Sequence, residues 1–499
     1  MRLFRRGGRR VTVVPVIVLS AVALVAGCSG ETAQPLAEGG RQGAIGGGKP
    51  GRAADVELAT DGSRSTGVVA AGGADAVYNY GPAVMAEGGR VRMWWCSQLG
   101  SAAPAGDDIL YAEAATADGP FAEPRAVLSG NPGAFDGVHT CDPSVLRVGG
   151  TYYLYYTGAA GDHAFGNAIG LATSTDGVTW TRANGGGAIL GPARDVHRDN
   201  VYGAGQPSVV FLDGWYYLMF TDTTGRAAGW NGAGQFVIRS QDPAFTKGVE
   251  ALGERGFEHA SGTNAPRTRS VVDGFSADLM WVEALDAFAI AHETFEGTTV
   301  TFFDRDFKMS PFRPVVIQGP WQEGPGLVRR ADGHAPLSSE NPCDRVPLDV
   351  VRATVIGGAK APTDLKHFGI DVKGVGACAD PKRAMTVLDG LAAPSPARTM
   401  DLLVGGKLVR VDRRSVAGAL ATRVLDRRPP EFDKLPVAAR LTASAKAVRA
   451  PERGIGLVLD DGKLWPVGSA DVTGMNDSSV EEITTAQWDA YPAGSALAR

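Results

Sequence analysis

The feature that most constrains the fold of this chain is a strand–turn–strand pattern that occurs more than once. Residues 139–158 read His-Thr-Cys-Asp-Pro-Ser-Val-Leu-Arg-Val-Gly-Gly-Thr-Tyr-Tyr-Leu-Tyr-Tyr-Thr-Gly, which predicts a strand, a Gly-Gly turn and a second, aromatic strand. The same pattern returns in residues 205–222, so that Pro143 and Pro207 lie 64 positions apart. One such hairpin would be ordinary, whereas a repeat in register predicts a fold of stacked units.

Five such units follow one another, and they begin at Tyr80, Asp142, Gln206, Ser276 and Glu323. Each unit spans about 45 to 70 residues of three or four short strands, too few to bury both of its faces alone. Radial stacking of such units gives a β-propeller. The sequence therefore predicts an all-β chain with a five-bladed β-propeller at residues 75–380. The alternative folds, a β-sandwich or a jelly roll, do not explain why the pattern returns in register.

A different repeat follows the propeller. Gly406-Lys407-Leu408 matches Gly462-Lys463-Leu464, and Phe432 matches Trp488, at a constant offset of 56 residues. We expect residues 385–499 to form a small β-rich C-terminal domain with a two-copy repeat. Its aromatic residues, among them Trp465 and Trp488, could bind a glycan or simply pack the module; the sequence leaves both alternatives open.

The N-terminus has the pattern of an export signal. Five arginines within residues 1–10 precede an apolar run over residues 11–27, which predicts a signal peptide at residues 1–27. The next motif, Val25-Ala26-Gly27-Cys28, resembles a bacterial lipobox, which implies cleavage and lipidation at Cys28. Residues 28–74 are rich in Gly, Ala, Ser and charges and predict a flexible tether. We expect a lipid-anchored protein on the outer face of the cytoplasmic membrane or in the cell envelope. The signal does not distinguish between export routes.

Charge and cysteine content agree with an exported protein that binds no nucleic acid. Cleavage removes five of the 49 basic residues and none of the 54 acidic ones, so the mature chain has 44 basic groups and a formal charge of −10. Phosphate backbones need basic patches, which argues against nucleic acid as a partner. Four cysteines remain besides Cys28, and an oxidising compartment favours two disulfides. Of three connectivities we favour Cys96–Cys141 and Cys343–Cys378, with free buried thiols as the alternative.

The blade motifs resemble a known enzyme family. Units that open with Asp-Pro-Ser-Val, return as Tyr-Tyr-Leu-Tyr-Tyr and continue as Ile-Gly-Leu-Ala-Thr-Ser-Thr-Asp-Gly-Val-Thr-Trp are similar to the five-bladed glycosidases related to glycoside hydrolase family 43, over roughly residues 78–372. The resemblance implies three carboxyl groups on inner strands of different blades. Asp142 matches the base, Asp278 the aspartate that tunes the acid, and Glu323 the general acid. The sequence departs from the family pattern in two ways. Leu279 replaces the proline expected after Asp278, and one blade precedes the blade that carries the base.

The chemistry of glycoside cleavage gives independent reason to examine these residues. One carboxylic acid must protonate the leaving oxygen while a carboxylate activates water, and a separation of about 6.5–9.5 Å leads to inversion at carbon. An Asp before Pro is also a common strand-end cap, so each assignment has a structural alternative. Further acidic candidates are Asp195, Asp199, Asp222 and Glu293. The predicted substrate-binding residues are Tyr80, His139, Tyr202, Gln206 and Trp281.

The sequence therefore favours an exported glycoside hydrolase that cleaves furanosidic or xylosidic linkages with a carboxylate acid and base. The alternatives are a catalytically inactive propeller that binds envelope glycan or protein, and a phosphorylase on the same fold. We expect a monomer with a carbohydrate partner, a membrane contact through the lipid alone, no required cofactor and no catalytic metal. The propeller centre could hold a structural cation.

Overall fold

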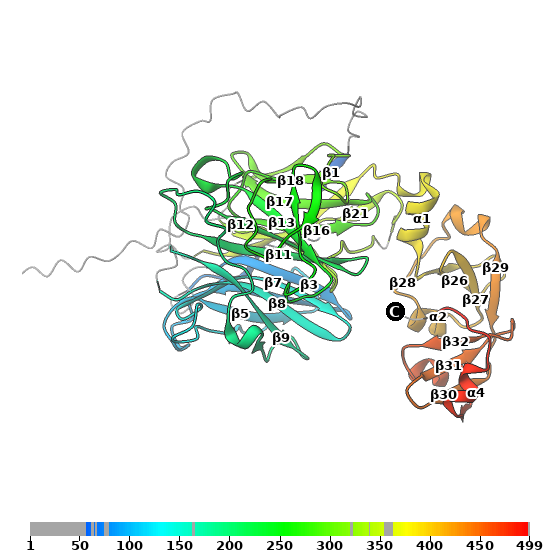
Figure 1. Cartoon of the computed structure of the whole chain (residues 1–499). Helices are drawn as coiled ribbons and strands as arrows, with labels where there is room; N and C mark the ends of the chain where they lie inside the picture. The colour runs from blue at the N-terminus through cyan, green and yellow to red at the C-terminus, as the bar shows by residue number, and fades with distance from the viewer. Residues whose placement is uncertain are drawn as a thin grey trace, which may run out of the picture.

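The computed structural model describes residues 56–60, 64, 67–73, 79–161, 165–319, 323–338, 340–353 and 363–497. This part of the chain consists mainly of strands, in agreement with the predicted all-β class (Figure 1). None of the helices in these ranges is long and apolar enough to cross a membrane. The predicted signal peptide and Cys28 lie outside the described residues.

Most strands of the first part belong to five antiparallel runs, each of which follows the chain. The first run is β3 (Tyr80–Glu87), β4 (Arg90–Ser97), β5 (Asp108–Ala114) and β6 (Arg125–Leu128). The second is β7 (His139–Val148), β8 (Thr151–Ala159), β9 (Ala168–Ser174) and β10 (Thr181–Arg182). The third is β11 (Ala204–Leu212), β12 (Trp215–Asp222), β13 (Gln235–Ser240), β14 (Glu250–Gly253) and β15 (Gly256–His259). The fourth is β16 (Ala277–Val282), β17 (Ala287–Thr294), β18 (Gly297–Phe303) and β19 (Val315–Gln318), and the fifth is β20 (Gly326–Arg329), β22 (Val350–Ala353) and β23 (Leu365–Phe368).

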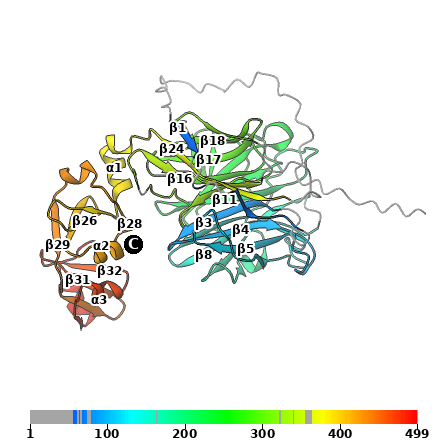
Figure 2. The ribbon, with the colours of Figure 1, turned by 180° about the vertical axis from the view of Figure 1, so that it is seen from behind.

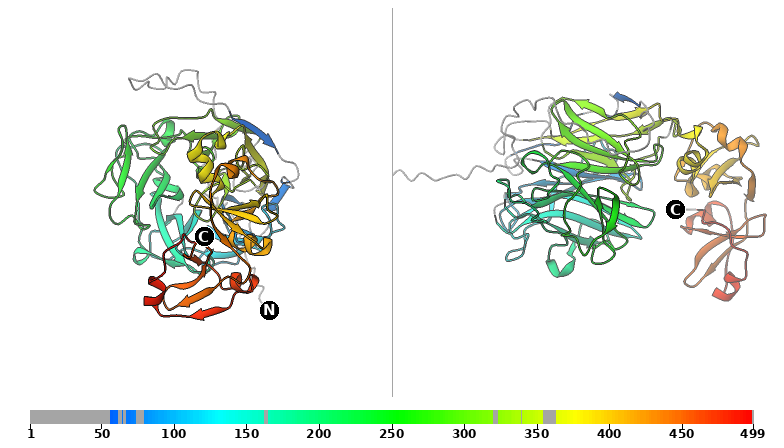
Figure 3. Two further views of the ribbon diagram at one scale, coloured as in Figure 1. Left: turned by 90° about the vertical axis from the view of Figure 1, so that its right-hand side faces the viewer. Right: turned by 45° about the horizontal axis from the view of Figure 1, so that its top comes forward.

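The first strands of these runs form a closed ring. β3 contacts β7, β7 contacts β11, β11 contacts β16 and β16 contacts β20. β20 then pairs in parallel with β3, with Val328 opposite Val84 and Arg329 opposite Met85. In the left view of Figure 3, the runs follow one another around a common centre. The ring brings the beginnings of five strands, far apart in sequence, to one place.

The aromatic return strands are buried on both faces because each run lies between two others. Tyr152, Leu154 and Tyr156 of β8 pack in one cluster with Trp94 of the preceding run. Tyr155, which points to the other face, packs with Phe220 of the following run. A strand that is covered on both sides does not need alternation of polar and apolar residues, which explains the run Tyr-Tyr-Leu-Tyr-Tyr.

Part of the predicted tether is ordered strand. β2 (Gly67–Ala70) pairs with β23. β1 (Glu57–Thr60) pairs with β24 (Ile370–Lys373) (Figure 2), and β24 also pairs with β21 (Arg345–Pro347). The prediction of a tether over all of residues 28–74 is therefore wrong for these two segments; the rest of that range up to residue 55 lies outside the described residues. The physical reason is that β23 would otherwise leave its edge amides and carbonyls without strand partners.

Three ring strands begin with the same irregularity, a β-bulge at an X-Pro step. The register shifts between Tyr80 and Ala83 in the first run, and at the equivalent places of the second and third. The residues before proline adopt positive φ angles of 54° at Gly81, 46° at Asp142 and 53° at Gln206. Proline cannot donate to the ladder, so the pairing breaks there. Positive φ is costly for a residue with a side chain, and such strain is typical of functional sites.

The C-terminal module begins at α1 (Pro381–Leu388), and two sets of elements follow, each of which starts with three strands, a helix and a further strand. The first set is β25 (Leu391–Pro394), β26 (Met400–Val404), β27 (Lys407–Val411), α2 (Arg414–Leu420), β28 (Arg423–Val424) and β29 (Val437–Leu441). The second is β30 (Ala447–Ala450), β31 (Gly454–Val458), β32 (Leu464–Val467), α3 (Asp471–Met475), β33 (Val480–Glu482) and α4 (Thr485–Asp489). Trp465 and Trp488 are 4% and 9% exposed, so they pack the module rather than offer a glycan platform.

Candidate active site

A cavity opens at the place where the five ring strands begin. It contains about 320 Å³ of empty space, including its opening to solvent. The residues that line it come from all five runs: Gly81, Pro82, Asp142, Pro143, Gln206, Pro207, Ser276, Ala277, Asp278, Gly324 and Pro325. The structure thus brings together Asp142, Gln206 and Asp278, which the sequence predicted as site residues.

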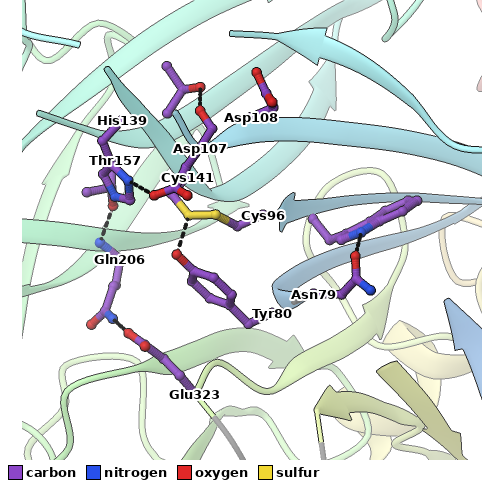
Figure 4. Close-up of a disulfide and its surroundings, with 12 residues drawn as sticks. Asn79, Tyr80, Cys96, Asp107, Asp108, His139, Cys141, Thr157, Gln206 and Glu323 are labelled. Carbon is purple, nitrogen blue, oxygen red and sulfur yellow. Dashed lines mark hydrogen bonds and ion pairs between the residues drawn. A yellow bond between two sulfur atoms is a disulfide. The ribbon is translucent and has the colours of Figure 1, made fainter. Parts of the chain in front are cut away.

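Glu323 lies beside this cavity, in the segment before β20 and next to the lining residue Gly324. Its Oε1 accepts a hydrogen bond from Nε2 of Gln206 (Figure 4), and Oγ of Ser276 lies 3.4 Å from the same oxygen. Burial and then the nearby charge of Asp142 raise the pKa of Glu323 to about 8. A carboxyl group with this pKa carries a proton at neutral pH, as a general acid must.

Asp142 lies on the opposite side of this hydrogen-bond network. Burial raises the pKa of its carboxyl group, and the charge of His139 and the hydroxyl of Thr157 act against that rise. Thr157 Oγ1 also accepts the backbone N–H of Gln206 at 2.7 Å. Gln206 therefore connects both carboxyl groups, one through its backbone and Thr157 and the other through its side chain.

Two glycines make room for the pair, which explains why the first repeat has no acid. A Cβ atom at Gly324 would lie 2.7 Å from Cα of Gly81, closer than packed atoms tolerate. A Cβ atom at Gly81 would lie 3.1 Å from Oδ1 of Asp142. Any larger residue at Gly81 would therefore push against the Asp142 carboxylate and also suffer from the positive φ.

A buried histidine and a further aspartate stand beside Asp142. His139, at the start of β7, contacts Oδ2 of Asp107 through its Nδ1 (Figure 4). His139 and Asp107 are 4% and 6% exposed. A ring nitrogen of His139, Sγ of Cys141 and a carboxylate oxygen of Asp142 all lie within 4.8 Å of one another. The prediction that His139 belongs to the site thus has a structural basis, although its close partners are protein carboxylates.

Asp278 has a different environment from Asp142. Its Oδ1 accepts Oγ of Ser208 at 2.5 Å and lies 3.2 Å from the guanidinium of Arg329, while its Oδ2 accepts the backbone N–H of Leu327 at 2.7 Å. Arg329 also donates to the carbonyl of Leu279 at 2.7 Å and lies 3.3 Å from Oγ of Ser144. This guanidinium places a fixed positive charge among the ring strands.

Both predicted disulfides are present, with Cα–Cα distances of 4.8 Å for Cys96–Cys141 and 5.1 Å for Cys343–Cys378. The first joins neighbouring runs next to Asp142. The Tyr80 hydroxyl lies 2.9 Å from Cys141 Sγ (Figure 4), so this predicted substrate-binding residue packs on the disulfide. Two groups of side chains near Asp142 have the spacing of metal ligands: Cys96, Asp107 and Cys141, and His139, Cys141 and Asp142. Because Cys96 and Cys141 form a disulfide, neither group offers a thiolate to a metal.

The prediction that Trp281 stacks on a sugar is wrong. Its ring is 1% exposed and packs edge-on against Phe288, with ring centroids 4.9 Å apart. The strand β16 turns this side chain into the core between two runs. Tyr202, in contrast, directs its hydroxyl toward Asp142 and lowers the pKa of that carboxyl group.

The sequence did not indicate three residues that the structure places at the site, namely Asp107, Thr157 and Ser276. Asp107 precedes β5, and Thr157 lies near the end of the aromatic strand β8. Neither position carries a motif. Ser276 opens the fourth unit of the repeat, but no catalytic motif includes a serine at that position. Asp222, an alternative acidic candidate, instead pairs with Arg267 at 3.2 Å.

Comparison with known proteins gives matches among solved structures alone. No family model matches the sequence, and no curated protein matches it. A family 117 glycoside hydrolase from Zobellia galactanivorans is 13% identical, with 65% of this chain and 92% of that chain covered and a TM-score of 0.42. The α-L-arabinofuranosidase PaAbf62A from Podospora anserina is 12% identical, with 61% and 95% covered and a TM-score of 0.39. A GH43_1 enzyme from Xanthomonas citri is 12% identical, with 68% and 95% covered and a TM-score of 0.40.

The chain is similar to glycoside hydrolases. They include a member of the family that the blade motifs resemble. Identities and TM-scores of this size carry no argument about activity, so the function has to rest on the chemistry of the cavity.

Proposed function

We propose that this protein is a glycoside hydrolase in which Glu323 is the general acid and Asp142 the general base. The observation that carries the proposal is a pair of carboxyl groups beside one cavity: Asp142 lines it, and Glu323 bonds to the lining residue Gln206 and has a pKa raised to about 8 in part by the charge of Asp142. A protonated carboxylic acid and a second carboxyl group at the same site are what acid–base cleavage of a glycosidic bond requires.

In the proposed reaction, Glu323 donates its proton to the glycosidic oxygen as the bond to the anomeric carbon breaks. Asp142 accepts a proton from a water molecule, whose oxygen attacks that carbon from the opposite face. The leaving alcohol and the sugar hemiacetal account for all atoms of substrate and water. A proton transfer from Asp142 to Glu323 through solvent restores the starting state. Inversion at carbon would require a carboxyl separation of about 6.5–9.5 Å in the complex.

We propose furanosides or xylosides as substrates, as the motif resemblance implies. The cavity is open to solvent, as the site of a glycoside substrate must be. Its lining includes few charged side chains, and this supports water over phosphate as the attacking group.

We further propose that the five strand runs are the blades of a five-bladed propeller and that residues 385–499 form a separate repeat module. The closed ring of first strands supports the former. Export and a lipid anchor at Cys28 rest on the N-terminal sequence, and the two disulfides support an oxidising compartment. The mature protein is proposed to act as a monomer without a cofactor.

Turnover of a panel of aryl furanosides and xylosides tests the proposal. Wild-type protein should release the aryl alcohol, and Asp142→Asn and Glu323→Gln should each remove most of that activity. An aryl substrate with a good leaving group should lose less in Glu323→Gln than one with a poor leaving group, because proton donation matters less for it. Glycan binding without turnover by the wild type would instead support the inactive binding propeller.

A further inference from the structure

We infer that Asp107 and His139 form an ion pair that keeps Asp142 ionised, so that the proton shared by the two cavity carboxyl groups resides on Glu323. The inference rests on the proposed function and deepens it. His139 and Asp107 act through Asp142 and are therefore positioning residues.

The pair is held firmly by the backbone. Asp107 and His139 form a bridge between the segment before β5 and the start of β7. The backbone carbonyl of Asp107 accepts the N–H of Thr140 at 3.2 Å and the Thr140 hydroxyl at 2.8 Å. With the backbone of Asp107 fixed in this way, its carboxylate meets Nδ1 of the buried His139 ring (Figure 4).

The bulge in β7 brings the charge of His139 to Asp142. Residues 139 and 142 would point to opposite faces of a regular strand. The register shift between Cys141 and Ser144, with a φ of 46° at Asp142, overrides that alternation. The result is a ring nitrogen of His139 within 4.8 Å of an Asp142 oxygen. The disulfide from Cys141 to Cys96 holds this part of the strand.

The two carboxyl groups need an asymmetric neighbour because nearby like charges do not both ionise in a buried site. Each carboxyl group has two uncharged hydrogen-bond donors. Gln206 and Ser276 donate to Glu323, and the hydroxyls of Thr157 and Tyr202 donate to Asp142. The charged neighbours are not balanced, because His139 lies beside Asp142, while Glu293, whose pKa burial raises, lies near Glu323.

The ionisable groups that face His139 agree with a protonated ring. They are the carboxyl groups of Asp107, Asp142 and Glu323. Burial lowers the pKa of His139, but the charge and hydrogen bond of Asp107 outweigh it, and the pKa is raised overall. The charge of His139 affects the pKa of Asp142 more strongly than the charge of Asp107 does, so the cation dominates the ion pair at this carboxylate.

The test is the pH profile of kcat/KM for Asp107→Asn and His139→Gln. The acidic limb reports ionisation of the base, and an opposite charge at this range lowers a carboxyl pKa by about 1–3 units. Loss of the His139 charge in His139→Gln should move the acidic limb up by about the same amount, with KM little changed. Asp107→Asn should move it up less, because the lost carboxylate itself raises the pKa of Asp142. The matched control is Asp118→Asn, which removes the same charge from a second buried pair, His367 Nδ1 with Asp118 Oδ1 at 2.7 Å, outside the cavity lining. Its acidic limb should stay in place.

An acidic limb that stays in place in both variants, with cooperative melting, would overturn the inference. Should the variants not fold, NMR of ¹⁵N-histidine-labelled protein decides with the wild type and Asp142→Asn. His139 should be charged at neutral pH in the wild type and titrate at lower pH in Asp142→Asn, since coupling between the two sites is reciprocal. A neutral His139, or the same titration in both proteins, would contradict the ion pair. If the wild type cleaves no aryl glycoside, the proposed function fails, while the NMR titration still tests the charge coupling by itself.

Discussion

Asp142 and Asp278 both lie near the start of a unit of the repeat, yet their carboxylates have different environments. Asp142 precedes a proline, adopts a φ of 46° and lies in a bulge beside a second carboxyl group. Asp278 precedes Leu279, pairs regularly with Ala291 and accepts the Leu279 N–H at 3.0 Å. Proline has no N–H to offer, so the Asp142 carboxylate stays available to the cavity. In these two strands, the residue after the aspartate distinguishes the carboxylate that we propose as the base from the one that joins strands.

The largest expected difference between the two aspartates is in activity. Asp142→Asn should lower kcat/KM by about 10²- to 10⁴-fold, the usual contribution of a general base. Asp278→Asn keeps the size of the side chain and should cost far less. Kinetics on one aryl glycoside would check both variants. An equal loss in Asp278→Asn with unchanged melting would favour the prediction that Asp278 tunes the acid and would break the comparison.

For stability we expect the opposite order, with a larger loss of unfolding free energy at Asp278 than at Asp142. Asp278→Ala leaves the buried Arg329 guanidinium without its carboxylate, a change that typically costs about 3–5 kcal/mol. Asp142→Ala removes a carboxyl group whose pKa is raised by burial and should cost much less. Urea denaturation would measure both free energies of unfolding. The double variant Asp278→Ala/Arg329→Met should recover part of the loss, and no recovery would argue against an ion pair as the cause.

The two disulfides extend the comparison to the surroundings of the site. Removal of either bond, as Cys96→Ala/Cys141→Ala or Cys343→Ala/Cys378→Ala, should cost about 2–4 kcal/mol of stability. Only the first bond adjoins Asp142, so only the first double variant should also lower kcat/KM when assayed well below its melting temperature. Equal kinetics in both would show that the disulfide does not position the base.

The smallest expected effect is a change in pH dependence at Glu323. Its pKa is raised to about 8 in the fold, so activity that needs its proton should fall as pH rises through about 8. A raised carboxyl pKa means that this group favours the folded state fully below its unfolded pKa, and that this contribution is lost as pH rises toward 8. Glu323→Gln should therefore melt a few degrees above the wild type at pH 9 and close to it at pH 4. The reverse order in a calorimetric pH series would contradict a buried, protonated Glu323.

Much of this arrangement could be read from patterns local in sequence. The repeat of Asp-Pro-Ser-Val and Gln-Pro-Ser-Val placed Asp142 and Gln206 in register, and Glu323 followed from the fifth unit. Both disulfides followed from the position of their cysteines. Asp107 and Thr157 had no such signal, since an aspartate before a strand and a threonine near the end of one occur throughout the chain.

The sequence by itself determined the order of strands and the bulged X-Pro steps, because strand periodicity and the missing proline N–H act within a few residues. The tertiary structure decided which charges meet. Closure of the ring brings Glu323 into hydrogen-bond contact with Gln206 and pairs Asp278 with Arg329. It also buries the Trp281 side chain in the core. It also gave β2 a place at the edge of β23, where the composition alone predicted a tether. These outcomes depend on contacts between residues that are far apart in sequence, and no local pattern encodes them.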